Sequence, residues 1–343
     1  MDQATNPFDG QEVFCEKDKI PEVDSFEKIG KAQYAANFTG TIIQSTGELY
    51  VGEKLVTDSV LMKPNCCCAI SQSNKRYLRT LEVPTDYVEP NIMLFRALGY
   101  SESKSKTLQF AFTENDCLID AVVTGYKNNT PLEAPEVSFQ LKNGMRITRE
   151  EAITVFADWL SDNSFVSEFY DAFEEYDTPE CAWEDSGVSE EAKVYADINE
   201  EDPWMQVEAA CIYECAKDYI EAYSLYANAI YALLHKKYNA AGIIIASMNI
   251  SCALADNGDM FFVNEIGTPN TALLVLKEEY EKTGKLEDFT LAAVMEYYNS
   301  IGYDVESTNA APLLPIDVLD KVSDAYMYLA EAVCDDLALE THM

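Results

Sequence analysis

The sequence predicts a fold that mixes helices and strands, and three observations support this prediction. Residues 241–276 hold short apolar runs around Asp256-Asn257-Gly258-Asp259, a pattern typical of a β-hairpin because Asn and Gly tolerate positive φ. Residues 203–238 repeat apolar side chains at steps of three and four, as a helix with one buried face does. We expect two further helices after the hairpin, at 288–301 and 316–337.

Within the hairpin stretch we expect strands at 243–245, 248–254 and 260–266, with Gly242 before the first and Gly267 after the last. Such a hairpin presents alternate side chains on one face. It is therefore suited to carry metal or phosphate ligands, and it is equally suited to be a plain part of the core. The long helix is expected to pack as a core helix through Val207, Ala210, Cys211, Cys215, Tyr219, Ala222, Leu225, Tyr226, Ala229 and Leu233.

Length and composition favour a soluble, cytoplasmic protein. The chain has 343 residues, 48% of them apolar, which is enough for one large domain or two small ones. No window approaches the roughly 18 uncharged apolar residues of a membrane span, and the N-terminus does not resemble a signal peptide. The ten cysteines, including the run Cys66-Cys67-Cys68, are expected to be reduced thiols. Cys211 and Cys215 are four residues apart, but with only two histidines in the chain we expect buried thiols rather than a zinc site.

The net charge of −36 excludes nucleic acid as a simple electrostatic partner, because phosphate contacts need Lys and Arg. A basic protein partner stays open, and so does plain solvation by the acidic surface. The charge is concentrated: residues 150–202 hold eighteen Asp or Glu and one basic residue, Lys193. Aromatic residues in this stretch argue against simple disorder.

The hairpin stretch resembles that of the SAICAR synthetases, ATP-dependent ligases of purine synthesis that join aspartate to a carboxylated aminoimidazole ribotide. That family has G-I-I-[IL]-[AV]-D-x-K-x-E-F-G, a turn, and then D-E-x-x-[TS]-P-D-x-S-R. The framework residues are kept here as Gly242, Ile243, Ile244, Ile245, Ala246, Glu265, Thr268 and Pro269. The charged residues are replaced, by Ser247 for Asp, Asn249 for Lys, Ser251 for Glu, Asn264 for Asp, Asn270 for the second Asp and Leu273 for Arg.

Two more segments resemble the same family before the acidic stretch. Gly30 and Lys31 match the Gly-Lys pair on the first strand of the family's nucleotide-covering sheet. Residues 117–136 resemble the strand P-[LV]-E-[VC]-[IV]-V-R-[GN]-Y-x-x-G-S, whose Arg and Ser carry the substrate phosphate. Thr124 replaces that Arg, and Thr130 keeps only the hydroxyl of the Ser. Threonine has no bidentate donor with which to grip a phosphate.

Elements after these segments also resemble the family. A helix begins near residue 147 with Thr148 and Glu151 spaced as a capping box. The family has a His-Asp pair before this helix, and Asn143-Gly144 stands there instead. The C-terminal part matches the family at Asp288, Gly302, Tyr303, Asp304, Leu314, Pro315, Val318, Lys321 and Tyr326.

The resemblance runs from Gly30 to about Val333, and it implies an α+β fold. In that fold an antiparallel N-terminal sheet lies over a larger sheet-and-helix part. We therefore divide the chain into a polar tail (1–24), an N-terminal sheet subdomain (25–115) and a larger α+β subdomain (116–343). The last of these contains the acidic stretch as an insertion at about 159–202.

The resemblance also implies site residues. ATP or substrate positions would be Gly30, Lys31, Thr124, Thr130, Ser247, Asn249, Asn270 and Asp288. The metal positions would be Ser251 and Asn264, with Glu265 the acid that remains nearby. Mg²⁺ prefers carboxylate oxygens, and phosphoryl transfer depends on charge stabilisation. The joint loss of the charged ligands favours an abandoned catalytic site.

Our leading hypothesis is a SAICAR-synthetase-like pseudoenzyme that binds or inhibits a macromolecular partner, for example as an acidic mimic of nucleic acid. The partner would be a basic protein, and the candidate contacts are Glu174, Glu175, Asp177, Glu184 and Asp185. The alternatives are an active SAICAR synthetase with a rebuilt site and a purine-nucleotide-binding protein that uses the old cleft. We expect no cofactor for the pseudoenzyme, and ATP with Mg²⁺ for an active ligase. The sequence leaves the partner's identity, the oligomeric state and the role of the cysteine run open.

Overall fold

The computed structural model covers the chain with gaps. It describes residues 41–43, 48–52, 54–57, 60–85, 109–111, 116–162, 178–254, 260–305, 307 and 309–334. The hairpin turn expected at 256–259 lies outside these ranges.

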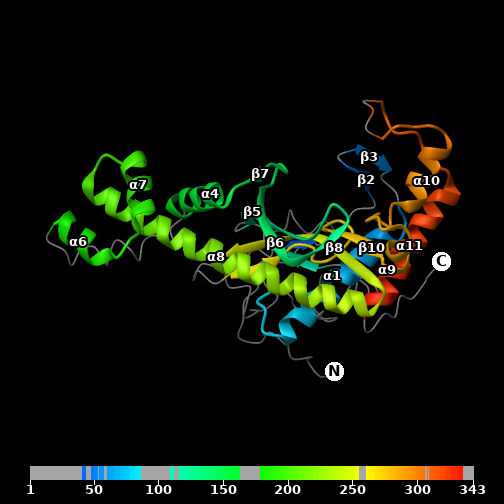
Figure 1. Cartoon of the computed structure of the whole chain (residues 1–343), viewed down its shortest axis with the longest axis horizontal. Helices are drawn as coiled ribbons and strands as arrows, with labels where there is room; N and C mark the ends of the chain where they lie inside the picture. The colour runs from blue at the N-terminus through cyan, green and yellow to red at the C-terminus, as the bar shows by residue number, and fades with distance from the viewer. Residues whose placement is uncertain are drawn as a thin grey trace, which may run out of the picture.

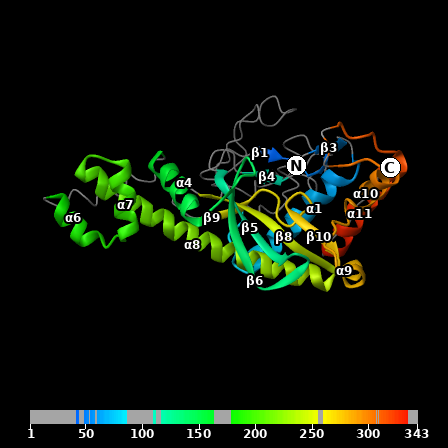
Figure 2. The same cartoon turned by 45° about the horizontal axis from the view of Figure 1, so that its top comes forward.

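An antiparallel sheet forms the centre of the molecule (Figures 1 and 2). Its strands follow the order β10-β8-β5-β6-β7, and β9 pairs with the outer end of β8. The strands are β5 (Asp116–Lys127), β6 (Thr130–Leu141), β7 (Arg146–Ile147), β8 (Ile243–Leu254), β9 (Met260–Val263) and β10 (Ala272–Leu276).

Two small antiparallel ribbons are formed by residues that come before β5 in the chain. They pair β1 (Thr41–Ile43) with β4 (Gln109–Ala111), and β2 (Leu49–Val51) with β3 (Lys54–Thr57). The Lys54 ammonium group ties the second ribbon to the C-terminal connection, since it donates to Tyr303 Oη at 3.0 Å and to the carbonyls of Val305 and Ser307 at 2.9 and 2.6 Å.

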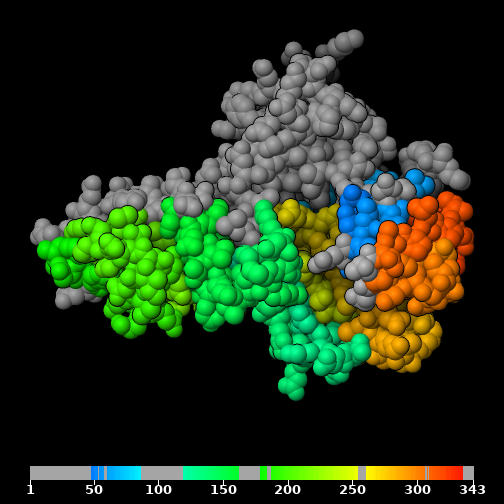
Figure 3. Space-filling view, turned by 90° about the horizontal axis from the view of Figure 1, so that it is seen from above, coloured from blue at the N-terminus to red at the C-terminus, as the bar shows by residue number. Residues whose placement is uncertain are grey.

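One long helix, α8 (Pro203–Ala240), runs along the sheet and beyond it (Figure 1). Its N-terminal part carries three helices, α4 (Arg149–Asp162), α6 (Pro179–Ser186) and α7 (Glu190–Asn199). Together these elements form a helical arm that extends to one side of the body, green in Figure 3. The insertion expected at 159–202 contains α6 and α7. The remaining helices are α1 (Lys63–Thr80), α9 (Lys277–Thr283), α10 (Ala292–Ser300) and α11 (Ile316–Val333).

Polar caps explain where several helices begin. The capping box predicted at α4 is confirmed: Glu151 N donates to Thr148 Oγ1 at 3.1 Å, and Thr148 N donates to the Glu151 carboxylate at 2.7 Å. The Asp202 carboxylate accepts from the first backbone N–H groups of α8, and Pro203 follows it at the first helical position, where it needs no N–H partner. None of the described helices is both long and apolar enough to cross a membrane.

The structure corrects the expected buried face of α8. Leu225 is 66% exposed and Tyr226 is 38% exposed, although both were predicted to be core residues. The buried stripe in this half of the helix lies one position away, at Ile220, Tyr223, Ala227, Ile230, Tyr231, Leu234 and Tyr238. The sequence of α8 contains two neighbouring apolar stripes. The stripe that faces the core is the one that contains tyrosines, whose rings are buried under the sheet.

The hairpin strands also differ from the expectation. Residues 243–254 form the single strand β8 rather than two half-strands, and β9 ends at Val263. A further strand, β10, was missed: it follows Gly267 and pairs antiparallel with the first half of β8. The turn at 267–270 therefore connects two strands of the same sheet.

The cysteine run lies on α1, where Cys66, Cys67 and Cys68 are fully buried and form no disulfide. Burial raises the pKa of the Cys66 thiol to about 12, which leaves it inert as a nucleophile. Cys211 and Cys215 are free as well, but they are only half-buried on α8. The expectation that these two are buried was therefore met in part.

Candidate functional site

The family ligand positions lie on one face of the central sheet. Helix α8 covers the opposite face, where Tyr223 Oη accepts from Ala121 N at 3.0 Å and donates to the Ile250 carbonyl. Since side chains alternate along a strand, Asp120 and Ser251, the neighbours of these two residues, point to the face away from α8. We call this the open face; it carries Asp120, Val122, Thr124, Ser247, Asn249 and Ser251.

The register of the strands sets which of these residues are neighbours. Directly opposite one another lie Asp120 and Ser251, Val122 and Asn249, Thr124 and Ser247, and Ser247 and Leu273. Thr124, Ser247 and Leu273, the family positions of Arg, Asp and Arg, therefore form one row across three strands. The structure brings these positions together, but none of the three side chains carries a charge.

A shift in the register of β8 against β10 determines which face of the sheet this row occupies. The pairing with β10 steps from Ser247 to Ile245, so that Ala246 is an extra residue. Before it, Ile243 and Ile245 point into the main core; after it, Met248 and Ile250 do. This shift places the polar residues Ser247, Asn249 and Ser251 together on the open face.

Asp120 is a functional-site residue that sequence reasoning missed. Its carboxylate accepts a hydrogen bond from Ser251 Oγ at 2.6 Å, across the β5–β8 pair. The strand motif held a signal for it, because the family has Glu at the position of Asp120, four residues before Thr124. One carboxylate thus stays beside the family's metal position, although on the neighbouring strand.

Polar contacts link the side chains of the segment between β9 and β10. The Glu265 carboxylate accepts from Thr268 Oγ1 at 2.6 Å and from Asn270 Nδ2 at 2.9 Å. Asn264, just before it, has a left-handed backbone with φ +60°, and its carbonyl accepts from Ser71 Oγ at 3.5 Å. Glu265 and Asn270 therefore bind each other, and the framework residue Thr268 completes the set.

Helix α1 contributes two buried groups beside this segment. Lys63 is 4% exposed and donates to the Glu48 carbonyl, and burial lowers the pKa of its ammonium group. Burial and the nearby Glu265 raise the pKa of the Cys67 thiol, while Lys63 opposes this shift. Lys63 was not singled out in the sequence, because a lysine at the start of a helix ordinarily lies in solvent, and Cys67 was considered only as part of the cysteine run.

Asp288 is half-buried in the same region, since Asp288, Cys67 and Glu265 all lie near Tyr326, and it is held by its own turn. Its Oδ1 accepts from Thr290 N at 2.9 Å and from Thr290 Oγ1 at 2.7 Å. Burial raises the pKa of Asp288 to about 6, although these hydrogen bonds favour the charged form. Its contacts are those of a residue that caps a turn.

Other predicted positions are not brought to the open face. Thr130 lies exposed at the tip of the β5–β6 hairpin, where its hydroxyl reaches only the Asn128 carbonyl at 3.5 Å. Gly30 and Lys31 lie outside the described residues, as do the partner-contact candidates Glu174, Glu175 and Asp177. Glu184 and Asp185 belong to α6, but their side chains are not described.

The residues present do not fit a metal site held by two carboxylates. Ser251 and Asn264 are neutral, and Glu265 is the one carboxylate that remains beside them in the family pattern. Within the described part of the chain, no group of three or more His, Cys, Asp or Glu side chains could hold a metal ion. Mg²⁺ would find one nearby carboxylate on the open face, that of Asp120.

No family model matches the chain. Two curated proteins are similar to part of it, both named phosphoribosylaminoimidazole-succinocarboxamide synthase. The one from Desulfatibacillum aliphaticivorans is 29% identical over 98 residues, which are 29% of this chain and 32% of that protein. The one from Pelobacter propionicus is 26% identical over 112 residues, 33% of this chain and 37% of that protein. The chain thus matches about a third of the length of these relatives.

Solved structures establish the fold over nearly the whole chain. The SAICAR synthase from Saccharomyces cerevisiae, complexed with SAICAR, has a TM-score of 0.61 at 13% identity and covers 94% of this chain and 98% of its own. A second SAICAR synthase structure has a TM-score of 0.56 at 13% identity, covering 86% of this chain and 89% of its own. The predicted α+β fold class is confirmed, and the chain is similar to the SAICAR synthetase family in sequence and fold.

Proposed function

We propose that this chain is a non-catalytic protein with the SAICAR synthetase fold, and that it binds a basic protein partner through its acidic helical arm. The observation that carries the first half is the neutral row of Thr124, Ser247 and Leu273. These side chains stand where the family has two guanidinium groups and a carboxylate. A row without charge offers little to a phosphate or to a developing negative charge.

The contacts of the second hairpin segment support the same proposal. Glu265, the acid kept from the family pattern, is held by Thr268 and Asn270. Asn270 stands for a second family acid, and its amide serves this internal contact. Phosphoryl transfer is catalysed chiefly by positioning and charge stabilisation, and a segment with one acid, already hydrogen-bonded to its neighbours, supplies little of either.

The arm supports the second half of the proposal. Residues 178–218 hold twelve Asp or Glu and two Lys. Like charges at this density repel one another, so a basic partner would stabilise the arm while its attraction speeds association. The cytoplasm is the compartment we propose, since the free thiols suit a reducing environment.

An activity assay tests the first half. Purified protein is incubated with ATP, Mg²⁺, aspartate and the carboxylated ribotide, and SAICAR is measured; an active SAICAR synthetase serves as the positive control. We expect no product above the blank without protein. Turnover of even about 1 s⁻¹, the low end of typical enzymes, would overturn the proposal.

Asp120 favours a second candidate function, the binding of a purine nucleotide with Mg²⁺ in the old cleft. Its carboxylate is the one charged group paired with a family metal position among the described residues of the open face. Calorimetric titration with Mg-ATP separates the two functions, because the non-catalytic partner binder gives no heat of binding. If heat is seen, Asp120→Asn is expected to weaken the affinity.

The candidate contact residues in the acidic stretch give a test of the second half. Replacing Glu174, Glu175, Asp177, Glu184 and Asp185 by Gln or Asn is expected to slow association with the partner and to flatten its salt dependence. Charges that steer the encounter act mainly on the association rate, so dissociation changes less. An association rate equal to that of the wild type at two salt concentrations would leave these five residues without a recognition role.

A further inference from the structure

The outward side of α7 carries two exposed apolar residues. Val194 is 58% exposed and Ile198 is 76% exposed, and their spacing of four places them next to each other on one side of the helix. The opposite side is already used, because Ala192 and Ala196 are fully buried. Helix α7 therefore has two apolar sides. One packs against the rest of the chain, and the other is exposed.

Acidic residues surround the exposed pair. Glu190 and Asp197 lie four and three positions from Val194 on the same side of the helix, and Glu201 lies just beyond the end of α7, after the C-cap Glu200. Asp197 and Glu201 make no side-chain hydrogen bond or ion pair with another described residue. We define the α7 ridge as Val194 and Ile198 with Glu190, Asp197 and Glu201.

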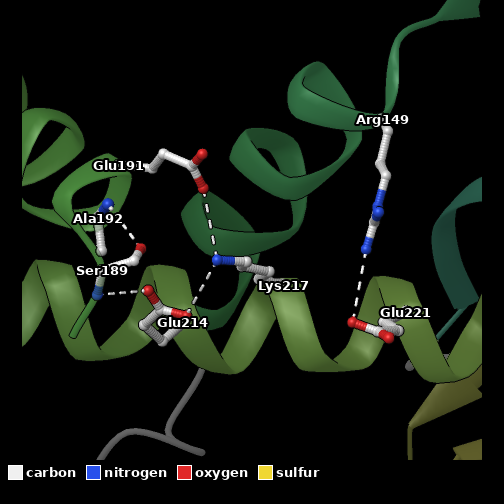
Figure 4. A network of polar contacts seen from close by, with 7 residues as sticks. All are labelled: Arg149, Ser189, Glu191, Ala192, Glu214, Lys217 and Glu221. Carbon is white, nitrogen blue, oxygen red and sulfur yellow. Dashed lines mark hydrogen bonds and ion pairs between the residues drawn. The ribbon is translucent and has the colours of Figure 1, made fainter. Parts of the chain in front are cut away.

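Only one acid of this ridge, Glu190, is neutralised by a cation of the arm. Its Lys217 lies between Glu191 and Glu214, at 3.4 and 3.6 Å, as Figure 4 shows. Lys193 pairs with Glu190 at 2.8 Å. These are the only two lysines in residues 178–218, and that segment has no arginine. Both are therefore engaged inside the arm, and the surplus charge on the ridge is negative.

The ridge is held in place by contacts on its inner side. Ser189 caps α7 by accepting from Ala192 N at 3.3 Å, and its own N–H donates to Glu214 at 2.8 Å (Figure 4). Tyr195 Oη donates to the Asp158 carboxylate at 2.8 Å, which links α7 to α4. A partner would meet a preformed helix and would not have to order it.

We infer that the α7 ridge is the docking surface for a basic amphipathic helix of a partner protein, with apolar residues over Val194 and Ile198 and Lys or Arg over the acidic rim. This inference rests on the proposed partner-binding function and names the partner's chemistry. Burial of Val194 and Ile198 supplies affinity, and the acidic rim selects a cationic segment. A second copy of this chain would bring acid against acid, and an anionic membrane surface or a nucleic acid would be repelled for the same reason.

The test uses the full chain and a synthetic peptide of about 18 residues, with Leu on one side of its helix and Lys on the other. A scrambled peptide of the same composition has equal charge but no apolar side. Val194→Ser/Ile198→Ser is expected to weaken binding of the amphipathic peptide by about tenfold or more. The matched control, Leu313→Ser/Ile316→Ser, changes residues that are 90% and 71% exposed elsewhere, and is expected to leave binding within about twofold of the wild type. The scrambled peptide should bind weakly and equally to all three proteins.

Further outcomes separate this inference from the proposed function. Asp197→Asn/Glu201→Gln is expected to slow association of the amphipathic peptide and to reduce its dependence on salt. Wild-type affinity in the Val194→Ser/Ile198→Ser protein would overturn the α7 assignment while leaving partner binding elsewhere on the arm intact. Failure of the wild-type chain to bind the amphipathic peptide would also overturn it. SAICAR production would instead overturn the non-catalytic proposal and say nothing of the ridge.

Discussion

Ser251 Oγ lies 2.6 Å from Asp120 Oδ1, across the pair of strands that forms the floor of the open face. The serine stands where the resembling family has a metal carboxylate, and the aspartate stands on the neighbouring strand. This short contact orients the only acid that faces a family metal position within the described sheet. Asp120 is therefore the first residue to change in a test of nucleotide binding at this face.

The Ser251–Asp120 bond gives the first prediction. Ser251→Ala is expected to lower the free energy of unfolding by about 1–3 kcal/mol, since a hydrogen bond to a charged group is lost and the carboxylate stays partly buried. Ser247→Ala is the matched control: Ser247 lies on the same strand, equally half-buried, and its hydroxyl has no partner among the described residues. We expect it to change stability by less than about 0.5 kcal/mol. Urea unfolding measures both, and equal losses would contradict the prediction.

The second prediction concerns the close approach of α8 to β5. A Cβ atom at Gly125 would lie 1.8 Å from Tyr231 Oη, whose hydroxyl donates to the Ile245 carbonyl at 2.7 Å. Gly125→Ala is therefore expected to cost about 3 kcal/mol, as overpacking of a buried contact does. Tyr231→Phe removes the nearest clashing atom, so the double variant should recover part of this loss, and thermal or urea unfolding measures it.

Gly144→Ala provides the control for that variant. Gly144 has φ +83°, and a Cβ atom there would meet nothing within 4 Å. Its substitution should cost about 1 kcal/mol from backbone strain alone, and Tyr231→Phe should not recover it. A loss at Gly144 that equals the loss at Gly125 would mean that the Tyr231 contact is unimportant.

The third prediction is a pH dependence of stability due to Asp288. Burial raises the pKa of this carboxyl from 3.8 to about 6 in the folded protein. Between these two values the unfolded chain binds fewer protons than the folded one, so this group reduces stability as the pH rises from about 4 to 6. Asp288→Asn keeps an oxygen acceptor for Thr290 and removes the ionisation.

The measurement compares unfolding of the wild type and Asp288→Asn at several pH values. The stability of the variant relative to the wild type should rise by about 1.4 kcal/mol for each pH unit across this window. It should then stay constant above about pH 7. Because all other carboxyl groups are shared by the two proteins, their contributions cancel in the difference. A difference that is flat from pH 4 to 7 would contradict the raised pKa.

The sequence predicted correctly those elements that are determined by residues close together in the chain. The capping box of Thr148 and Glu151 formed as expected, and α8 runs from Pro203 to Ala240, close to the predicted 203–238. Both depend on short-range geometry, namely a cap three residues from its acid and an apolar repeat along one helix.

The features that the sequence did not predict depend on contacts between distant residues. The face of α8 that is buried was decided by tyrosines reaching strand carbonyls, as Tyr223 does at Ile250. The extra residue at Ala246, which sets the open face, comes from the pairing of β8 with the unforeseen β10. Asp120 joins the site only through the register of β5 against β8. A period of two along a strand cannot reveal which residue lies opposite.

The last prediction concerns Lys54, which joins β3 to the connection before α11. Its ammonium group donates to Tyr303 Oη and to the carbonyls of Val305 and Ser307, and lies 5.3 Å from the centre of the Tyr303 ring. Lys54→Met keeps the length of the side chain but leaves these acceptors without their donor. We expect a loss of about 1–3 kcal/mol, because a donor shared by several acceptors is hard to replace by water in a half-buried place.

Hydrogen exchange locates this effect. The Tyr303 and Ser307 amides, which donate to the Tyr298 and Asp304 carbonyls, should exchange about tenfold faster in Lys54→Met. The amide of Asn249, which bonds to the Thr271 carbonyl in the central sheet, should keep its wild-type rate when exchange occurs by local opening. Lys236→Met, at an exposed lysine of α8, serves as the matched control and should change neither. Uniform acceleration of all these amides would show that Lys54 supports the whole fold rather than this connection alone.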